Sequence, residues 1–380
     1  MFQQLQTHHE RIEFMNHLKD SFKERATKID EDGLFPFSNI EELKQSGYSA
    51  LTVPKAYGGN EISLLEMVML QAKIAEGDGA TALGIGWHIG IMKNLSEKNN
   101  WPSQTFAKLC EEVKKGALIN SAATELQTGS PTRGGKPATT AVERNGKWEI
   151  NGRKTYTTMA PVLDYFLVSA SMEDGGVGNF LVPRTSKGVS IEETWNSIAM
   201  KGTASHDLVL NKVQLSQDNY VERIVPGKKQ AAGWLLHIPA CYLGIAQAAR
   251  NEAITFAKHY SPSSISGTIS ELPNVQQKLG EIELLLIQSR HFLYSVANKW
   301  DESGSEARMN MQAELGAVKY SVTNNAIKVV DLAMRVVGAK SLSSKSPLQR
   351  YYRDVRAGLH NPPMDDATIS LLAKTALASF

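Results

Sequence analysis

The chain has 380 residues, of which 42% are hydrophobic and 21% charged, and its formal net charge is +2 at pH 7. This balance, with no run of five or more basic residues, argues against a nucleic-acid-binding protein. No window approaches the roughly 18 consecutive apolar residues of a membrane span, and the polar N-terminus lacks the apolar stretch of a secretory signal. Cys110 and Cys241 are far apart and in no metal or redox spacing, so we expect a cytoplasmic protein with reduced thiols and no metal site.

The first third of the chain is predicted to be helical. A short amphipathic segment begins near Ile40 and ends at Gly47, a typical helix stop. A further helix is expected to begin at Ser63, because Glu66 follows at the spacing of a capping box. Residues 81–92 are mostly small or apolar, which favours a buried helix.

The middle of the chain, from Ser121 to Tyr220, changes to short alternating runs separated by turns. This pattern predicts the strands of a small β-sandwich or barrel. Asn145–Gly146 stands between two such runs and predicts a hairpin, while Asn151–Gly152 is expected to begin the next strand. The block opens with a polar loop that contains glycine, Thr124–Ser130, of a kind that can hold a cofactor.

The last third is again helical in pattern. Helices are predicted over 233–260 and 275–296, and a third from about Glu306 to Val337, ending at Gly338. Such helices form a bundle and often leave surface for a partner subunit. We therefore expect a mainly α protein with a β insert (α+β). Its expected domains are an N-terminal helical domain (1–118), a middle β domain (119–228) and a C-terminal four-helix bundle (229–380).

Five segments, in the same order along the chain, resemble motifs of the acyl-CoA dehydrogenase superfamily. Leu51–Gly59 resembles the family's early turn, and Thr124–Ser130 resembles its flavin loop. Asn151–Thr158 is similar to its strand of pattern NG-K-x-aromatic-x-T. Val336–Ala339 resembles its late glycine turn, and Arg350–Asp354 resembles its RD pair. Each motif alone is weak, whereas their order and spacing together are a strong signal. The resemblance covers nearly the whole chain and implies the fold described above.

The resemblance implies that FAD binds in a cleft between the middle domain and the bundle. Thr124 would meet the pyrimidine edge of the flavin, and Ser130 would line the path of the FAD or substrate phosphates. Tyr156 would lie against the isoalloxazine in place of the family's usual tryptophan, and Thr158 would bond the flavin nitrogen that accepts hydride. Taken singly, Tyr156 and Thr158 are more typical of ordinary strand residues. The remaining FAD contacts that the resemblance implies are Gln276, Arg335 and Gly338.

The reaction implied first is α,β-dehydrogenation of an acyl-CoA thioester with hydride transfer to FAD, a step of lipid metabolism. It needs a carboxylate base within hydrogen-bond reach of the substrate proton. The two places where the family carries its glutamate fall on Pro362 and Trp234, neither of which titrates. Asp365 is a substitute candidate. However, Asp365 and Asp366 also precede an apolar helix, and we favour a role in stabilising its N-terminus.

A second branch of the superfamily, which includes dibenzothiophene monooxygenase, uses reduced flavin and O2. Its members end in a similar LH-x-P segment, here Leu359–Pro362, and residues 200–207 resemble a loop of their β domain. His88 falls where those enzymes have a functional histidine, so it is a candidate for proton exchange near neutral pH. An equally good interpretation is that His88 is a structural residue of a helix, with its ring nitrogens hydrogen-bonded within the protein. His360 is either a catalytic candidate or a helix C-terminal cap.

At two positions that hold the FAD pyrophosphate in the family, this chain has a different residue. The arginine that crosses the dimer interface in the family corresponds to Ala257, and its late glutamine corresponds to Arg335. FMN is therefore the alternative cofactor. We rank an acyl-CoA dehydrogenase first, a flavin monooxygenase second and a non-catalytic flavoprotein third. We expect a small-molecule substrate, an acyl-CoA in the first case, no nucleic-acid or membrane partner, and a homotetramer or homodimer. The sequence does not identify the electron acceptor, or a flavin reductase that would supply reduced flavin.

Overall fold

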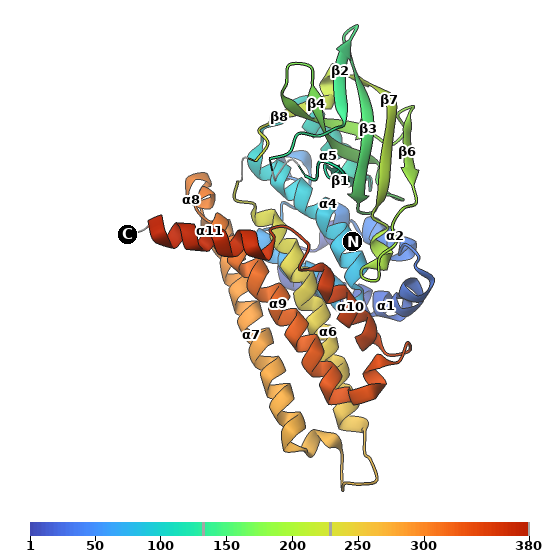
Figure 1. Ribbon diagram of the computed structural model, residues 1–380, viewed down its shortest axis with the longest axis vertical. Helices are drawn as coiled ribbons and strands as arrows, with labels where there is room; N and C mark the ends of the chain where they lie inside the picture. Colours follow the sequence, from blue (N-terminus) through green and yellow to red (C-terminus); the bar gives the residue numbers. More distant parts are fainter. Residues whose placement is uncertain (131–133, 228–229, 379–380) are drawn as a thin grey trace.

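A β-sheet lies at one end of the molecule, and long helices extend away from it (Figure 1). This arrangement follows the chain order, in which helices come first, strands next and further helices last. The computed structural model describes residues 1–130, 134–227 and 230–378. The predicted mainly α architecture with a β insert is confirmed.

The N-terminal helices are α1 (His8–Asp32), α2 (Phe37–Ser46), α3 (Leu64–Gly77), α4 (Gly79–Lys98) and α5 (Ser103–Lys114). The three helical segments predicted in the first third are present as α2, α3 and α4, whereas α1 and α5 were not predicted individually. The helix α2 ends at Gly47, whose φ of 84° is left-handed, and Ser63 caps α3 by accepting a hydrogen bond from the Glu66 nitrogen. The predicted capping box is incomplete, because the Glu66 carboxylate pairs with Arg11 of α1 instead. The predicted buried helix is α4.

The middle of the chain forms a sheet whose eight strands in the described ranges run in the order β6-β7-β3-β2-β4-β5-β8, with β1 beside β4. The strands are β1 (Ile119–Ala122), β2 (Thr140–Arg144), β3 (Lys147–Thr157), β4 (Tyr165–Met172), β5 (Val177–Pro183), β6 (Val189–Glu192), β7 (His206–Ser216) and β8 (Tyr220–Ile224). The hairpin predicted at Asn145–Gly146 joins β2 to β3, and both turn residues have positive φ. The expectation that Asn151–Gly152 begins a new strand is wrong. The strand β3 continues through it with a register shift, because the glycine makes room for the Thr139 side chain.

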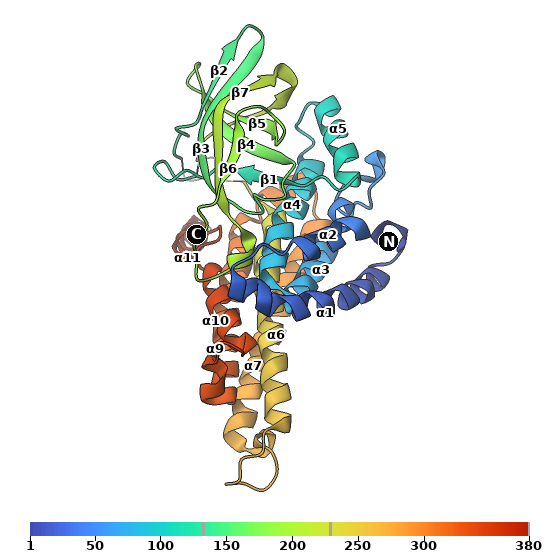
Figure 2. The same cartoon turned by 90° about the vertical axis from the view of Figure 1, so that its right-hand side faces the viewer.

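The C-terminal helices are α6 (His237–His259), α7 (Pro273–Glu302), α8 (Ser305–Met309), α9 (Gln312–Val337), α10 (Pro347–Ala357) and α11 (Asp365–Ala378). The three longest pack on one another, and α10 packs against α6 and α9 (Figure 2). The single helix predicted from Glu306 to Val337 is wrong, because the chain turns between α8 and α9. At this turn Arg308 stacks over the Trp300 ring and donates to the Trp300 carbonyl oxygen at 2.8 Å.

The helix α4 lies at the junction of the three parts of the chain (Figure 2). It contacts β1 of the sheet, α6 of the bundle and the short helix at 201–203 that precedes β7. The end of β3, which the sequence associates with a flavin, and segment 200–207, which it associates with the monooxygenase branch, both lie at this junction. In the described ranges, no helix combines the length and the apolar character needed to cross a bilayer.

Candidate functional site

Two turns meet where the sheet approaches the helices. The first, residues 156–160, ends β3, and the second, residues 198–205, precedes β7. The Met159 main-chain nitrogen donates a hydrogen bond of 2.9 Å to the Thr203 carbonyl oxygen, which joins the two turns. We call these two segments together the turn cluster.

The backbone of the turn cluster is strained. Four of its residues with side chains have left-handed φ: Tyr156 (57°), Met159 (63°), Met200 (51°) and Ala204 (40°). Each such conformation costs on the order of 1–3 kcal/mol, and strain of this kind concentrates at functional sites. The turn cluster is therefore the first place to look for a ligand.

The outer surface of the turn cluster is apolar and open. The pairing of β3 with β7 is irregular between Lys154 and Thr157, and Tyr156, within this irregularity, has 59% of its surface exposed. The Tyr156 ring packs edge-to-face on Trp195, with centroids 6.2 Å apart, and Ile198 is 74% exposed. These side chains offer a wall against which a flat ring can pack.

Three hydroxyl groups run in a line through the turn cluster. Thr158 Oγ1 lies 2.9 Å from Ser205 Oγ, and Ser205 Oγ lies 2.9 Å from Thr203 Oγ1. The Thr203 hydroxyl donates to the Met200 carbonyl oxygen at 2.9 Å. Thr203 and Ser205 are buried, whereas Thr158 is half-buried. The line is therefore closed at Met200 and opens outward at Thr158.

His88, on α4, holds the strand next to Thr158. Its Nδ1 accepts a hydrogen bond from the Ile119 nitrogen at 3.0 Å, so Nε2 carries the proton and donates to the Ser49 carbonyl oxygen at 3.0 Å. Burial lowers the pKa of His88 to about 4. The neighbouring Asn120 donates from Nδ2 to the Thr158 carbonyl oxygen at 2.9 Å. These contacts favour the interpretation of His88 as a satisfied helix histidine, which positions β1 rather than exchanging protons.

The loop Thr124–Ser130 is organised around the buried carboxylate of Glu125. Its donors are Lys154 Nζ (2.6 Å), Thr139 Oγ1 (2.6 Å), the Thr139 nitrogen (3.0 Å), Thr128 Oγ1 (2.7 Å) and the Ala138 nitrogen (2.6 Å). Burial alone would raise the pKa of Glu125, but these hydrogen bonds outweigh it and lower the pKa to about 2. The Thr124 carbonyl oxygen accepts from the Thr155 nitrogen at 2.9 Å, which fixes the loop beside the end of β3.

A clasp from α10 holds the second turn. Asp354 Oδ1 accepts from the Met200 nitrogen at 2.6 Å. Arg353 donates to the Ile198 carbonyl oxygen at 2.6 Å and forms an ion pair with Asp30 of α1 at 2.5 Å. Burial raises the pKa of Asp354 to about 7. The RD pair seen in the sequence thus ties α1, the turn cluster and the bundle together, and we call this arrangement the RD clasp.

A second buried histidine, His237, begins α6. Among the described residues neither of its ring nitrogens has a hydrogen-bond partner, and burial lowers the pKa of His237 to about 3. Its ring stacks on Trp234 with centroids 6.1 Å apart and meets Trp87 edge-on at 4.9 Å. Gly90 of α4 makes room for this packing, because a Cβ there would lie 2.8 Å from the Trp234 ring. Trp234, at one of the two places expected for a glutamate, is thus packed among aromatic rings.

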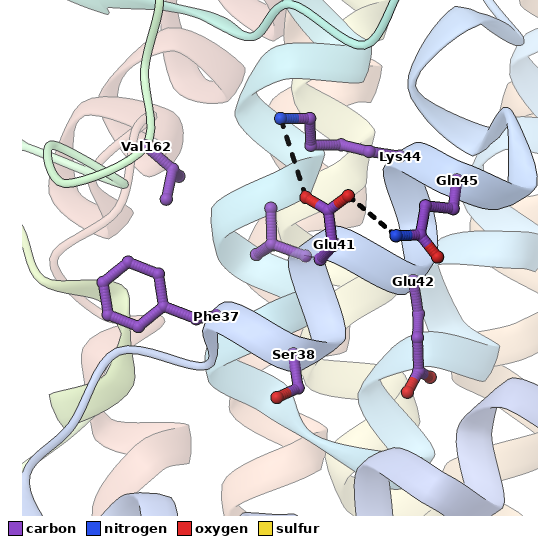
Figure 3. A pocket seen from close by; sticks show the side chains of 8 residues that line it. Phe37, Ser38, Glu41, Glu42, Lys44, Gln45 and Val162 are labelled. Atoms are coloured by element: carbon purple, nitrogen blue, oxygen red, sulfur yellow. Dashed lines mark hydrogen bonds and ion pairs between the residues drawn. The ribbon is translucent and has the colours of Figure 1, made fainter.

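An open hollow of about 480 Å³ lies between α2 and Val162 (Figure 3). Several of its polar groups already have partners: Glu41 accepts from Gln45 Nε2 at 2.9 Å and lies 3.8 Å from Lys44 Nζ, and Glu42 pairs with Arg25. None of the hydroxyl groups of the turn cluster lines it. We therefore assign the candidate site to the turn cluster and not to this hollow.

Comparison with known proteins identifies the family. Models of the acyl-CoA dehydrogenase N-terminal, middle and C-terminal domains match residues 11–99, 120–213 and 236–361. "Putative acyl-CoA dehydrogenase YdbM" of Bacillus subtilis (strain 168) is 52% identical over 370 residues, which are 97% of each chain. The chain belongs to the acyl-CoA dehydrogenase family.

Two solved structures show how widely this fold is used. TdsC from Paenibacillus sp. A11-2, in complex with FMN and indole, matches with a TM-score of 0.87 and 22% identity and covers 98% of both chains. Methanesulfinate monooxygenase MsuC from Pseudomonas fluorescens matches with a TM-score of 0.85 and 21% identity over 97% of both chains. At these identities the likeness establishes the fold alone.

The acyl-CoA dehydrogenase family consists of flavoproteins. Its characterised members are oxidoreductases that act on small molecules. The family binds FAD, so a flavin is the cofactor, as the sequence indicated. The turn cluster suits a flavin on its own evidence. Tyr156 and Ile198 expose an apolar wall, and Thr158 keeps a hydroxyl at the open end of a hydrogen-bonded line.

The other FAD contacts expected from the acyl-CoA dehydrogenase resemblance lie at the opposite end of the bundle (Figure 1). We call Gln276 near the start of α7, with Arg335 and Gly338 at the end of α9, the distal group. Gln276 is exposed and donates to the Ser270 carbonyl oxygen at 3.1 Å, and exposed Arg335 donates to Asp331 at 2.7 Å. A Cβ added at Gly338 would meet nothing within 4 Å. One chain therefore does not bring the distal group to the turn cluster.

The candidates for a base lie on the segment after α10. Asp365 begins α11 and accepts hydrogen bonds of 2.9 Å from Lys319 Nζ and from Asn324 Nδ2. His360 is exposed. The position of Asp365 in the first turn of α11 agrees with the helix-stabilising role favoured from the sequence, and its partner Lys319 is buried.

Four residues of the site were not predicted from the sequence: Asn120, Lys154, Thr203 and Ser205. Lys154 stands inside the NG-K motif, and Thr203 and Ser205 lie inside segment 200–207, so the resemblance marked their segments but not their roles. Nothing in the sequence marked Asn120, because its partner is a main-chain carbonyl oxygen.

Proposed function

We propose that this chain is a flavin-dependent monooxygenase that takes up reduced flavin and uses O2 on a small molecule. The observation that carries this proposal is that, in the described part of the chain, neither place where the family's dehydrogenases carry their glutamate holds a carboxylate. Sequence correspondence puts Pro362 and Trp234 at those places, and Trp234 is packed against His237. Asp365 is paired with Lys319 and Asn324.

The described carboxylates bonded to the turn cluster or to the neighbouring strands are also engaged. Glu125 is held by Lys154, Asp354 by the Met200 nitrogen, and Asp207 by Arg153 and Thr194. In Glu125 and Asp207 the hydrogen bonds outweigh the effect of burial and lower the pKa, and a carboxylate stabilised in its charged form is a weak base. Burial raises the pKa of Asp354, but its side chain is buried and bonded to the Met200 nitrogen, beneath the second turn. The site is thus better suited to holding a flavin in a defined orientation than to removing a proton from carbon.

The residues of the chain would divide the work as follows. A bound flavin supplies the redox chemistry. Tyr156 would pack against the ring, Thr124 would meet its pyrimidine edge, and Thr158 would bond the nitrogen of its central ring. Ser130 would line the path of the phosphates. His88 and the RD clasp would act from behind, by holding β1 and the second turn in place.

FMN suits this chain at least as well as FAD. The place of the family's interface arginine falls on Ala257, which is fully buried in the bundle, while the adjacent Lys258 is exposed. Holding the adenylate half of FAD would require the distal group of a second copy, which supports a homodimer or homotetramer. Both cysteines are free and buried, which supports the expected cytoplasmic location.

Acyl-CoA dehydrogenation is the second candidate. It is favoured by the name of the 52% identical relative from Bacillus subtilis and by Asp365, a carboxylate on the segment where the family's glutamate is expected. In that case Asp365 would have to give up its ion pair with Lys319 before it could accept the substrate proton.

The two candidates are separated by one pair of measurements on the flavin-loaded protein. Anaerobic acyl-CoAs of several lengths are added while the flavin absorbance is followed, and O2 uptake is measured with a flavin reductase present. We expect no bleaching by acyl-CoA, and O2 uptake beyond that of the reductase alone. Bleaching that falls about 10³-fold in Asp365→Asn but persists in Asp366→Asn would establish the dehydrogenase. Loss of both activities would indicate a non-catalytic flavoprotein.

A further inference from the structure

The hydroxyl line of the turn cluster has a fixed number of protons. Thr158, Ser205 and Thr203 each carry one hydroxyl proton, and the line contains three contacts of 2.9 Å, the last of them to the Met200 carbonyl oxygen. A carbonyl oxygen has no proton to give, so the Thr203 proton must occupy the contact with Met200. The Ser205 proton must then point to Thr203, and the Thr158 proton to Ser205.

The reverse order is unfavourable for a simple reason. If the Thr158 proton pointed outward, one of the three contacts would hold two oxygens 2.9 Å apart with no hydrogen between them, and their lone pairs would repel. The Met200 carbonyl oxygen also accepts from the Thr203 nitrogen at 3.0 Å and from Trp195 Nε1 at 3.3 Å. These donors are N–H groups, and they do not relieve the contact between the two oxygens.

From this order we infer that Thr158 presents only lone pairs outward, so that the site selects the reduced flavin, whose central-ring nitrogen carries a hydrogen, over the oxidised flavin, whose nitrogen does not. Thr203 and Ser205 are positioning residues in this scheme, because they direct the Thr158 proton inward without touching the cofactor. The inference rests on the proposed function, in which Thr158 meets that nitrogen of the ring.

This preference matches the way such an enzyme would receive its cofactor. A protein that takes up flavin reduced elsewhere benefits from binding the reduced form more tightly than the oxidised form it releases. The donor–acceptor match at Thr158 supplies such a difference within a single hydrogen bond. One neutral hydrogen bond of this kind is worth on the order of tenfold in relative affinity.

The test is the midpoint potential of the bound flavin in wild type and in Thr203→Val. Removing the Thr203 hydroxyl frees the Ser205 proton to point to Thr158, and the Thr158 proton is then free to point outward. We expect the reduced form to lose about tenfold in relative affinity, which lowers a two-electron potential by about 30 mV. Thr203→Ser should restore the wild-type potential. In a Thr158→Val background, Thr203→Val should have no further effect, because the outward hydroxyl is absent.

Each outcome has a distinct meaning. A potential in Thr203→Val that equals or exceeds that of wild type would overturn the inference and leave the proposed function intact. Failure of the wild-type protein to bind any flavin would overturn the proposed function itself. Ser205→Ala serves as a second variant if Thr203→Val does not fold, since it also frees the Thr158 proton. Visible absorbance and circular dichroism establish cofactor content and folding before each titration.

Discussion

The turn cluster and the distal group were both marked by the same resemblance, yet their environments differ sharply. In the turn cluster the hydroxyl line, the RD clasp and the hydrogen bond from Asn120 hold a strained backbone in one conformation. In the distal group Arg335 is a surface side chain paired with its own helix, and Gly338 faces open space. One end is organised within the chain, whereas the other lacks such a network.

This difference separates two kinds of cofactor contact. A site that must orient a reactive ring needs groups fixed before the ring arrives, because ordering them during binding costs free energy. A contact to a phosphate or an adenine can be made by exposed side chains of another subunit. We therefore expect substitutions in and around the turn cluster to have larger effects than those in the distal group.

The largest effect is expected for Glu125→Ala. This change leaves Lys154 fully buried without its ion-pair partner and removes the acceptor that organises the loop 124–130. Breaking one side of a buried pair costs about 3–5 kcal/mol of unfolding free energy. Urea unfolding monitored by circular dichroism measures it. Glu143→Ala, at an exposed position of β2, is the control and should change the free energy by less than about 0.5 kcal/mol. A similar loss in both variants would show that Glu125 has no special role.

The next effect concerns His88 and pH. Because burial lowers the pKa of His88 to about 4, the unfolded chain binds a proton at this residue between pH 6.5 and pH 4 that the folded chain does not. Wild type should therefore lose about 3 kcal/mol of stability at this residue as the pH falls through that window.

The variant His88→Gln can keep both main-chain hydrogen bonds but cannot titrate. The difference in unfolding free energy between wild type and His88→Gln should thus shift in favour of the variant by about 3 kcal/mol between pH 7 and pH 4. His17→Gln, at an exposed position of α1, is the control for an effect of any histidine. A difference that stays constant with pH would mean that His88 takes up a proton as readily in the folded protein as in the unfolded chain, which would contradict a lowered pKa.

The smallest effect is expected for Arg335→Ala in the distal group. Its exposed ion pair with Asp331, one turn away on α9, contributes less than about 0.5 kcal/mol, so stability should hardly change. Affinity for FMN should be unchanged, and affinity for FAD should fall by no more than about fivefold, the equivalent of about 1 kcal/mol. Isothermal titration with each flavin checks both expectations. A large loss of FMN affinity would move the flavin site away from the turn cluster.

The sequence predicted the elements better than their contacts. The helix stop at Gly47, the cap at Ser63 and the hairpin at Asn145–Gly146 depend on neighbouring residues, so local patterns were sufficient. The contact between Thr158 and Ser205 joins positions 47 residues apart, and no local pattern reports which two turns will face each other.

The same limit applies to His88. The sequence marked it as a residue of interest, but its partners are main-chain groups of Ser49 and Ile119, which every residue type provides. Asp365 was easier to interpret, because an acid in the first turn of an apolar helix is a local signal. Its ion pair with Lys319 on α9 adds a contact that only the folded chain reveals.

The most direct measurement is the pair of dissociation constants of the wild-type protein for reduced and for oxidised FMN, determined anaerobically in the same buffer. We expect the reduced form to bind about tenfold more tightly, since Thr158 offers an acceptor to its nitrogen-bound hydrogen. Equal affinities, or tighter binding of oxidised FMN, would contradict a site built to receive reduced flavin.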